Sequence, residues 1–370
     1  MKVALVHDYL KEYGGAERVL KVLTEMYPRA PIYTAFRVRG STADKEFRNK
    51  KIVESLLAPL LKIWKFYSPL RFLAPWVWRS FDLSDYDLVI TSCSWYVTRG
   101  FRVGPKTKVV AYCHTPPRWL YGYETSVGFT KYWPVKVYST IVGHFIRMYD
   151  FKVAQPIKYW VTNSKNVAAR IKKFYRKDAV VIYPPVEVAS IMNNVSSIKY
   201  EKENYFLIVS RLVGAKGLEE TAKVFKNLPY KLKIVGEAHG FSDVEKRLKR
   251  LAGGNIELVG RVSDDNLYDY YTRAKGFIAL ARDEDFGMTP VEAQAAGTPV
   301  IAFNGGGFRE TVIEGVTGIL INDTDEKTIS EAINRFNKIK WNKKNLQENA
   351  RKFSKERFEK KIRKYVESRM

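Results

Sequence analysis

Cysteine is scarce in this sequence. Its 370 residues include only two, Cys93 and Cys113. So few cysteines exclude a secreted scaffold held together by many disulfides, and they exclude a zinc site built from four thiolates. A reducing compartment fits this composition best. Both cysteines lie in predicted buried strands, where we interpret them as small core residues.

Long apolar runs are also missing. No stretch approaches the roughly 18 uninterrupted apolar residues that a membrane-spanning helix needs. The apolar segment within residues 1–8 is too short for the core of a signal peptide. We therefore expect a cytoplasmic protein that carries no visible export signal and does not span a membrane.

Acidic residues are outnumbered by basic ones. The chain has 39 Asp and Glu against 63 Lys and Arg, a net charge of +24. Residues 1–185 hold 31 basic and 13 acidic side chains, whereas the rest of the chain holds 32 and 26. This asymmetry indicates an anionic partner for the first half, either nucleic acid or an acidic lipid surface. A lysine-rich face that meets only solvent is the alternative.

The length and the strand pattern predict two domains of the α/β class. Short β-branched runs alternate with helical stretches, and after a gap the same rhythm returns. The predicted strands are residues 2–7, 32–36, 88–92, 109–113 and 160–163, and then 205–210, 232–236, 256–259, 277–281, 299–303 and 318–321. This order is typical of doubly wound parallel sheets.

A boundary is expected near residue 190. The run Tyr183-Pro184-Pro185-Val186 and the polar stretch 190–204 have the composition of an interdomain linker. Residues 1–190 then form the first domain and 191–350 the second. Apolar residues recur about once a turn in the charged tail 342–370, which predicts a closing helix pair whose last part, residues 351–370, packs back on the first domain.

One insertion, residues 56–81, interrupts this rhythm. It holds three tryptophans and three prolines, together with Lys62, Lys65, Arg71 and Arg79. Wide apolar faces mixed with long basic side chains are typical of an element that rests at the level of lipid headgroups. The aromatic and basic stretch 131–159 extends the same surface. The alternative is that these aromatics cover the first domain's core or a protein interface.

Two glycines, Gly14 and Gly15, open the helix that follows the first strand. Glycine lets the backbone approach a ligand closely, and the helix N-terminus offers free N–H groups to a phosphate or a sugar oxygen. The turn lacks the G-x-G-x-x-G fingerprint, and the chain has no phosphate loop of the G-x-x-x-x-G-K-[ST] type. Both absences argue against a dinucleotide dehydrogenase and against an ATPase of the phosphate-loop class.

The turn after the first strand of the second domain carries two cations. Arg211 follows the predicted strand, and Lys216 stands at the start of the next helix. Two cations at the carboxyl end of a strand are suited to neutralising a diphosphate. A surface salt bridge is the alternative for either residue alone.

The segment 284–297, E-D-F-G-M-T-P-V-E-A-Q-A-A-G, leads from a strand into a helix of small residues. Thr289 is a plausible N-cap with Pro290 at the first helical position, so Glu292 could simply complete a capping box. The same carboxylate could also accept a hydrogen bond from a ribose hydroxyl. Glu284 has no comparable structural reason to be there.

Glu284 and Glu292, separated by seven residues, resemble the E-x7-E signature of retaining glycosyltransferases of the GT-B fold, family 4. The flanking motifs agree: H-D-Y-L and G-G-A-E-R-V-L near the N-terminus, S-R-L at 210–212, G-R-V-S at 260–263 and G-G-G-F-R-E-T-V at 305–312. The motif Y-C-H-T-P-P-R-W-L-Y at 112–121 looks like the subgroup that contains GDP-mannose-dependent mannosyltransferases.

The resemblance implies two Rossmann-like domains that face each other across a cleft, with the nucleotide sugar held by the second. It implies that Glu284 contacts hydroxyls of the donor sugar and that Glu292 binds the ribose. Arg211 and Lys216 match the pair that holds the diphosphate and stabilises charge on the departing nucleotide. His114 matches a histidine near the donor sugar. The remaining donor contacts would come from the Gly14 and Gly15 loop, the N–H groups of Gly287, Met288 and Thr289, and the surroundings of Val262.

The reaction implied is transfer with retention at the anomeric carbon, in which the leaving diphosphate helps deprotonate the acceptor. No cofactor and no metal are implied; three Asp-x-Asp strings occur, a pattern too short to indicate a metal site. GDP-mannose is the expected donor and a UDP-hexose the possible alternative. The expected acceptor is a lipid-linked or surface glycan, reached by peripheral binding to an anionic membrane on its cytoplasmic face.

The sequence leaves three alternative hypotheses. A transferase with a soluble acceptor, of the sucrose or trehalose synthase type, is disfavoured by the insertion 56–81. A basic nucleic-acid-binding protein is disfavoured because no helix-turn-helix or RNA-stacking motif appears, so only non-specific electrostatic binding is expected. An inactive scaffold is disfavoured because both glutamates and both cations of the signature are present.

Overall fold

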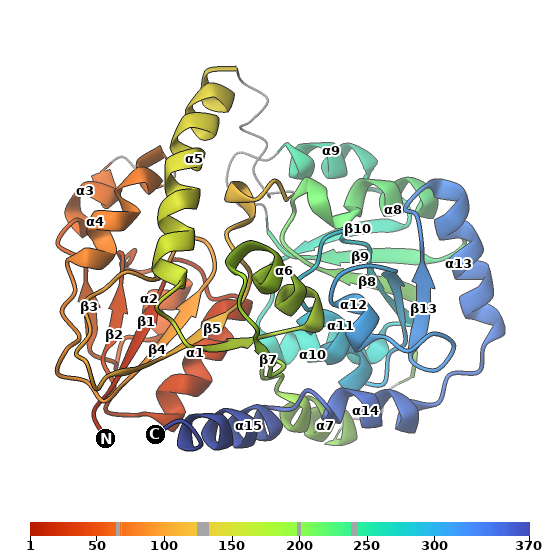
Figure 1. Ribbon diagram of the computed structural model, residues 1–370. Coiled ribbons are helices and arrows are strands. Elements are labelled where there is room, and N and C mark those ends of the chain that lie inside the picture. Colours follow the sequence, from red (N-terminus) through yellow and green to blue (C-terminus); the bar gives the residue numbers. More distant parts are fainter. Residues whose placement is uncertain (64–66, 68, 124–132, 198–200, 238–242) are drawn as a thin grey trace. The chain divides into compact units, whose positions relative to one another are not determined.

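The computed structural model describes residues 1–63, 67, 69–123, 133–197, 201–237 and 243–370 (Figure 1). The chain divides into two compact units. The first holds Met1–Tyr123, the chain from residue 133 to Pro185, and Phe358–Met370, and the second holds Val186–Arg357. Among the described residues, no helix is both long and apolar enough to cross a membrane.

The first unit is built on a parallel sheet of seven strands in the order β3-β2-β1-β4-β5-β6-β7. The strands are β1 (Val3–His7), β2 (Ile32–Thr34), β3 (Ile52–Glu54), β4 (Leu88–Cys93), β5 (Lys108–Cys113), β6 (Tyr159–Thr162) and β7 (Val180–Val181). The two short strands β3 and β7 were not predicted: β7 has only two residues and the three residues of β3 are only half-buried, so neither forms a buried apolar run.

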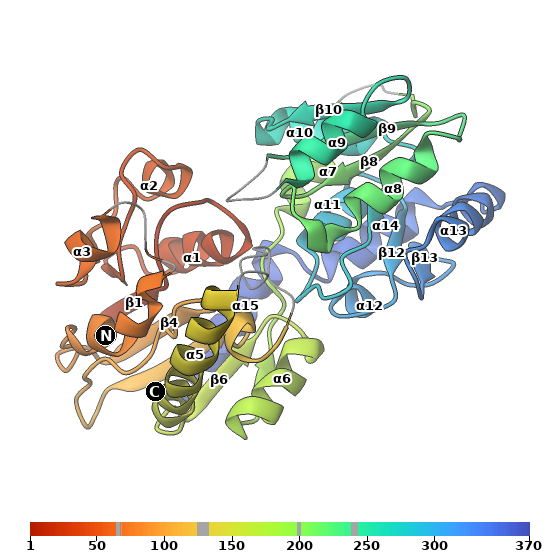
Figure 2. The ribbon, with the colours of Figure 1, turned by 90° about the horizontal axis from the view of Figure 1, so that it is seen from above.

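Helices connect these strands. They are α1 (Gly15–Met26), α2 (Thr42–Glu46), α3 (Ala58–Lys62), α4 (Ala74–Arg79), α5 (Trp133–Ala154) and α6 (Lys165–Tyr175), with 3₁₀ turns at Pro69–Leu73 and Arg118–Leu120. Helices α5 and α6 lie side by side (Figure 2). The alternation of strand and helix is that of a doubly wound domain.

Both faces of the first sheet are buried, as side-chain alternation along β1 shows. Val3 and Leu5 belong to a cluster with Leu20 of α1, whereas Ala4 and Val6 belong to another with Trp78 of α4. Successive residues of a strand point to opposite faces, so a parallel strand covered on both sides is apolar throughout. This is why its sequence reads as an uninterrupted apolar run.

The second unit has a parallel sheet of six strands in the order β10-β9-β8-β11-β12-β13. They are β8 (Tyr205–Val209), β9 (Lys231–Val235), β10 (Ile256–Gly260), β11 (Gly276–Ala279), β12 (Val300–Phe303) and β13 (Gly318–Ile321). Helices α7 (Val188–Ser197), α8 (Leu218–Phe225), α9 (Val244–Leu251), α10 (Asp264–Arg273), α11 (Met288–Ala295), α12 (Phe308–Thr311), α13 (Glu326–Lys338) and α14 (Lys343–Arg351) accompany it, with a 3₁₀ turn at Gly214–Lys216.

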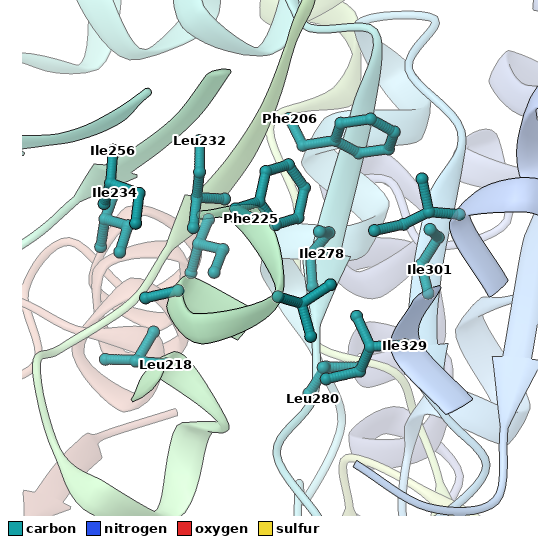
Figure 3. Close-up of a cluster of buried hydrophobic side chains, with 14 of the residues drawn as sticks. Phe206, Leu218, Phe225, Leu232, Ile234, Ile256, Ile278, Leu280, Ile301 and Ile329 are labelled. Atoms are coloured by element: carbon teal, nitrogen blue, oxygen red, sulfur yellow. The ribbon is translucent and has the colours of Figure 1, made fainter. Parts of the chain in front are cut away.

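One core cluster of the second unit lies on one face of this sheet (Figure 3). Phe206, Leu232 and Ile278 from the strands meet Phe225 of α8 and Ile329 of α13 in one buried cluster. All eleven strands predicted from the sequence are present, within one or two residues of their expected ends. The predicted α/β class with two Rossmann-like doubly wound domains is confirmed.

The expectation of a linker over residues 190–204 is wrong for its first half. Helix α7 occupies Val188–Ser197 and buries Val188, Ile191 and Val195 against the second unit. The asparagines and serines that suggested a linker stand among these apolar residues, which recur at helical spacing. The last residues of that stretch before Glu201 lie outside the described part of the chain.

Two helices close the chain, as the tail pattern predicted: α14 and α15 (Lys355–Glu367). Phe358, Ile362 and Val366 of α15 are buried in the cluster of the first unit that contains Val3 and Leu5. The chain therefore returns to the first unit after completing the second.

The insertion 56–81 has two kinds of aromatic residue. Trp78 is fully buried and donates from Nε1 to the carbonyl oxygen of Tyr96 at 2.8 Å, so it is a core residue rather than part of an interface. Trp76 is 58% exposed. Three further apolar side chains of this segment, Leu56, Leu60 and Ile63, are exposed as well. Lys65 and its neighbour Trp64 lie outside the described residues.

Candidate active site

The second unit places its charged candidates where the strand order reverses. β8 and β11 are neighbours in the sheet although two strands, β9 and β10, lie between them in the sequence, and ligands bind at such positions beyond the carboxyl ends of the strands. Lys216 follows β8 and Glu284 follows β11. Their side chains form an ion pair of 2.5 Å between Nζ and Oε2, and each side chain is about a quarter exposed.

A small pocket opens at this pair. Lys216, Glu284 and Thr289 are the polar candidates that line it, together with apolar residues of β8 and β11 and with Phe308. Arg211 is exposed, and in the part of the chain that the structure describes its guanidinium has no hydrogen-bond or ion-pair partner. The pocket therefore contains one paired cation, Lys216, whereas Arg211, two residues after the end of β8, is not part of its lining.

Glycines 305–307 hold the Glu284 loop in place. Gly306 has a φ of +53°, and a Cβ there would lie 2.2 Å from the carbonyl oxygen of Glu284. Gly307 donates its N–H to the same oxygen at 2.9 Å, and a Cβ on Gly307 would lie 2.3 Å from the Cα of Phe286. Sequence reasoning noted this triplet only as a flanking motif, because backbone contacts between distant loops leave no pattern in either segment.

The capping box that Thr289 and Glu292 could have formed is absent. Helix α11 begins at Met288, and its N-cap is Gly287 with a φ of +90° and no side-chain cap. Glu292 is only 3% exposed, and its Oε2 accepts a hydrogen bond of 2.8 Å from the hydroxyl of Tyr271. With Gly287 as the N-cap, the helix begins two residues earlier than expected, so Glu292 lies beyond the reach of the cap.

The other donor-side candidates of the second unit are not part of the lining of this pocket. Gly287 is buried and Met288 is half-buried at the start of α11. A Cβ on Gly287 would lie 2.7 Å from the ring of Phe308, so glycine is needed for the close packing of this turn. Val262 follows β10 and is half-buried. The structure thus brings Lys216, Glu284 and Thr289 together in one pocket, whereas Val262 and Glu292 are not part of its lining.

In the first unit, three polar side chains meet at the carboxyl ends of β1, β4 and β5. His7 Nδ1 lies 3.0 Å from Ser92 Oγ, and Ser92 Oγ lies 2.8 Å from His114 Nε2. His114 follows β5 directly, as predicted, and is 8% exposed. Burial, and then the nearby His7, lower the pKa of His114 to about 3, so this side chain is neutral near pH 7.

The glycine turn joins the same group of residues. Gly14 is the N-cap of α1 and Gly15 is its first, exposed residue. The N–H of Gly14 donates to Glu17 Oε2 at 2.9 Å, while Glu17 Oε1 lies 3.2 Å from His7 Nε2. Sequence reasoning passed over Glu17, His7 and Ser92. The only available signal was that His7 and Ser92 both stand at predicted strand ends.

Asp8 anchors the loop that follows β4. Its Oδ2 accepts from the N–H of Ser94, the hydroxyl of Ser94 and the N–H of Trp95. Burial raises the pKa of Asp8. Beyond this loop, Arg71 of the insertion lies between the rings of Trp95 and Trp119, at 4.7 and 5.0 Å from their centroids. One basic residue of the insertion is therefore held against the sheet end by aromatic rings rather than presented to solvent.

Both cysteines are free and fully buried, which confirms their assignment to the core. Among the described residues, no group of three or more His, Cys, Asp or Glu side chains gathers as metal ligands would. In the last Asp-x-Asp string, Asp323 pairs with Arg282 at 2.6 Å and Asp325 caps α13 through the N–H of Thr328.

Two family models match this chain. The model described as Glycosyltransferase Family 4 matches residues 13–190, and the model described as Glycosyl transferases group 1 matches residues 193–353. Together they account for nearly the whole chain. The chain belongs to these glycosyltransferase families. A solved structure of HepE from Anabaena in complex with UDP-glucose shares the fold, with a TM-score of 0.70 and 17% identity over all of both chains, and the predicted GT-B fold is thereby confirmed.

Sequence relatives of this glycosyltransferase match part of it. An uncharacterized glycosyltransferase of Methanocaldococcus jannaschii is 30% identical over 205 residues, 54% of this chain and 57% of the relative. The O-antigen chain mannosyltransferase of Salmonella typhimurium is 30% identical over 193 residues, 49% of this chain and 52% of the relative. The chain thus spans about half the length of each of these two relatives.

Proposed function

We propose that this glycosyltransferase moves a hexose, with mannose preferred, from a nucleotide diphosphate sugar to a lipid-linked or surface glycan. It acts with retention at the anomeric carbon, in the cytoplasm, bound peripherally to the inner face of the cell membrane. The observation that carries the proposal is the ion pair of Lys216 and Glu284 at the carboxyl edge of the second sheet.

The roles of these residues follow from their chemistry. Lys216 and Arg211 bind the diphosphate and stabilise the charge that develops on it as the sugar departs. Glu284 accepts hydrogen bonds from donor-sugar hydroxyls while its carboxylate keeps Lys216 in position. Glu292 accepts from a ribose hydroxyl in place of, or beside, the Tyr271 hydroxyl. The N–H groups of Gly287, Met288 and Thr289 contact sugar and phosphate oxygens.

The transfer step needs no enzyme nucleophile in this scheme. The leaving diphosphate takes the proton of the acceptor hydroxyl on the same face of the sugar, which preserves the anomeric configuration. The Gly14 and Gly15 turn closes on the diphosphate, Val262 lies near the base and His114 near the donor sugar. Arg211 and Lys216 supply the positive charge that a metal ion supplies in other transferases, so activity in EDTA is expected.

Mannose is preferred for two reasons. The segment 112–121 resembles the GDP-mannose-dependent subgroup, and one relative is named as a mannosyltransferase of O-antigen chains. The alternative donor is a UDP-hexose, used with another glycan or a soluble acceptor. It is supported by the fold shared with HepE, whose solved structure contains UDP-glucose.

The membrane part of the proposal is supported by exposed apolar side chains of the first unit. On α5, Val137, Ile141, Phe145 and Met148 are exposed at spacings of three or four residues and therefore share one face. The first turns of α5 extend beyond the sheet (Figure 1), and the hydroxyl of Tyr138 donates to the carbonyl oxygen of Pro69 in the insertion. Exposed apolar residues next to a strongly basic half of the chain suit an anionic lipid surface.

A ligand screen tests the donor assignment without knowledge of the acceptor. The melting temperature of the purified protein is measured with GDP, UDP, ADP and their sugar derivatives, with and without EDTA. A ligand at about 100 times its Kd adds about 2.7 kcal/mol to the free energy of unfolding. We expect stabilisation by GDP and GDP-mannose that EDTA does not remove. A preference for UDP would overturn mannose, and no response to any nucleotide would contradict the proposed function.

Matched variants connect that response to the site. Lys216→Ala should weaken GDP binding at least about tenfold, because the diphosphate loses a charge-assisted contact. The unfolding free energy should change by less than about 1 kcal/mol, since this ion pair is partly solvated. Lys223→Ala, at an exposed position of α8, is the control and should bind like the wild type. Unchanged GDP affinity in Lys216→Ala would place the nucleotide elsewhere.

A further inference from the structure

The four side chains Glu17, His7, Ser92 and His114 form an unbroken chain of contacts in the first unit. The successive distances are 3.2 Å from Glu17 Oε1 to His7 Nε2, 3.0 Å from His7 Nδ1 to Ser92 Oγ and 2.8 Å from Ser92 Oγ to His114 Nε2. His7, Ser92 and His114 are each less than a tenth exposed. Water therefore competes little with these hydrogen bonds.

Strand pairing explains why these residues meet. His7 of β1 and Ser92 of β4 are register partners, and β5, which ends directly before His114, is the next strand in the sheet. The N–H of His114 donates to the carbonyl oxygen of Cys93 at 2.9 Å, and its carbonyl oxygen accepts from Asn163 Nδ2 at 2.9 Å. The backbone on both sides of the His114 ring is thus fixed.

Glu17 determines which atoms donate and which accept in this series of hydrogen bonds. A carboxylate only accepts hydrogen bonds, and Glu17 already accepts from Gly14 through its other oxygen. When His7 is neutral, it carries its proton on Nε2 and donates it to Glu17, which leaves His7 Nδ1 to accept from the Ser92 hydroxyl. Ser92 Oγ in turn accepts from Nε2 of His114. A neutral histidine with a proton on Nε2 has a bare Nδ1.

That nitrogen is available. Among the described residues, Nδ1 of His114 has no hydrogen-bond partner, although every other polar group of this residue has one. Asp8 follows His7 directly; its Oδ2 is occupied by Ser94 and Trp95, and its buried Oδ1 has no hydrogen-bond partner among the described residues. Asp8 therefore makes no contact with His114 that could change the direction of the chain.

We propose that Glu17, His7 and Ser92 are positioning residues that hold His114 in the Nε2–H tautomer, so that its bare Nδ1 accepts a hydrogen bond from a sugar hydroxyl of the substrate. Because Glu17 also holds Gly14, the same carboxylate links the glycine turn to His114. The role given to Nδ1 rests on the proposed function, whereas the tautomer does not.

The variant Glu17→Gln tests the direction of the hydrogen bonds between Glu17 and His114. Its amide oxygen must keep the hydrogen bond from Gly14, so its NH2 group faces His7 and donates where the carboxylate accepted. Each hydrogen bond along the chain then reverses, and His114 carries its proton on Nδ1. The side chain keeps its size, so the change is one of proton position.

Nitrogen NMR reads the tautomer directly. The full-length chain, labelled with 15N-histidine, contains only four histidines, and a His114→Gln sample identifies the His114 signals. In long-range 1H–15N spectra at pH 8 we expect a protonated Nε2 and a bare Nδ1 in the wild type, and the reverse in Glu17→Gln. Glu12→Gln, a neighbouring glutamate outside the chain, should give the wild-type pattern. A protonated Nδ1 in the wild type, or identical His114 spectra in wild type and Glu17→Gln, would overturn the proposal.

A second variant shows whether the effect of Glu17→Gln passes through Ser92 or comes from a general change in the fold. Ser92→Ala removes the hydroxyl that connects His7 to His114. Adding Glu17→Gln to Ser92→Ala should therefore no longer move the His114 signals. If Glu17→Gln still moves them in the Ser92→Ala background, the effect does not pass through Ser92 and the proposal fails.

Kinetics then address the role of Nδ1. Glu17→Gln should lower kcat for sugar transfer about 10- to 100-fold with a smaller change in the KM of the donor, because the hydrogen bond from the sugar hydroxyl to Nδ1 is lost, while Glu12→Gln should match the wild type. The expected tautomers in a wild-type protein that transfers no sugar would contradict the proposed function alone. Normal kcat in Glu17→Gln with a reversed tautomer would remove the substrate contact from the proposal.

Discussion

At the scale of single residues, charge is treated differently in the two units. Lys216 and Glu284 keep part of their surface in solvent and satisfy each other, whereas His114 is neutral because burial disfavours its charged form. A group that is kept neutral only by the fold must influence how stability depends on pH.

Below pH 6.5, His114 is protonated in the unfolded chain but stays neutral in the folded chain, because burial lowers its pKa to about 3. The free energy of unfolding should be unaffected by this group above pH 6.5 and should fall below it, by up to about 1.4 kcal/mol per pH unit. Urea denaturation at pH 7, 6 and 5 measures this slope, and His114→Gln should have a shallower one. Burial raises the pKa of Asp8, which has the opposite effect but is common to both proteins.

His144→Gln is the control for that comparison, because His144 is exposed on α5. It should keep the wild-type slope. Equal slopes in wild type and His114→Gln would mean that His114 accepts a proton in the folded state without cost.

At the scale of elements, two loops fix the position of Glu284, and one helix, α5, exposes the apolar side chains of the proposed membrane surface. The Glu284 loop is held by the glycines of the loop after β12, and the outer face of α5 carries apolar side chains into solvent. The first arrangement depends on close backbone contact and the second on exposed area, so different substitutions test them.

Gly306→Ala should destabilise the protein by about 1–3 kcal/mol and weaken donor binding, because a Cβ at this position would meet the carbonyl oxygen of Glu284 at 2.2 Å. Gly315→Ala is a matched control: its φ is also positive, at +71°, but no atom lies within 4 Å of the added carbon. The control should lower the free energy of unfolding by only about 1 kcal/mol, the cost of a positive φ for alanine, and should leave donor binding intact. Denaturation midpoints and GDP calorimetry distinguish the two, and equal effects would show that the glycine triplet does not hold the Glu284 loop.

The pair Ile141→Glu and Phe145→Glu should reduce binding to phosphatidylglycerol vesicles at least about tenfold without destabilising the fold. These side chains are 55% and 64% exposed, so they contribute little to the core, but each adds apolar area and no charge to the α5 face. Vesicle sedimentation at low salt measures the effect. Ile313→Glu with Val316→Glu, at exposed apolar positions of the second unit, is the control. Vesicle binding that survives the α5 pair, or that is absent in the wild type, would contradict the membrane proposal.

At the scale of the whole molecule, the net charge of +24 acts on any polyanion. We therefore expect DNA binding that depends on charge alone. It should weaken at least about tenfold between 50 and 200 mM salt, and two DNA duplexes of equal length but unrelated sequence should bind equally. Fluorescence anisotropy at both salt concentrations tests this. A preference for one sequence that persists at 200 mM salt would favour the nucleic-acid-binding alternative over the transferase.

The fold was predictable to a large extent because parallel strands buried on both faces, such as β1 and β4, are marked by continuous apolar runs. The exceptions have physical reasons. β7 has two residues and leaves no periodic signal, and α7 was mistaken for a linker because its polar residues were weighed more heavily than the spacing of Val188, Ile191 and Val195.

The candidate site was predictable only where chemistry is local in the sequence. Arg211, Lys216, Glu284 and Glu292 stand in short motifs that a resemblance can recognise. Glu17, His7 and Ser92 were missed, since three separate segments supply them and only strand pairing brings them together.

The sequence by itself determined the composition of this protein's elements, the positive charge of its first half and the family to which it belongs, because these depend on residue type and on short-range order. Only the tertiary structure decided that Glu292 meets Tyr271 instead of a helix cap, that Trp78 is core while Trp76 is exposed, and that His114 stands at the end of a hydrogen-bonded chain. Each of these depends on contacts between residues far apart along the chain, and the packing of a whole unit fixes such contacts.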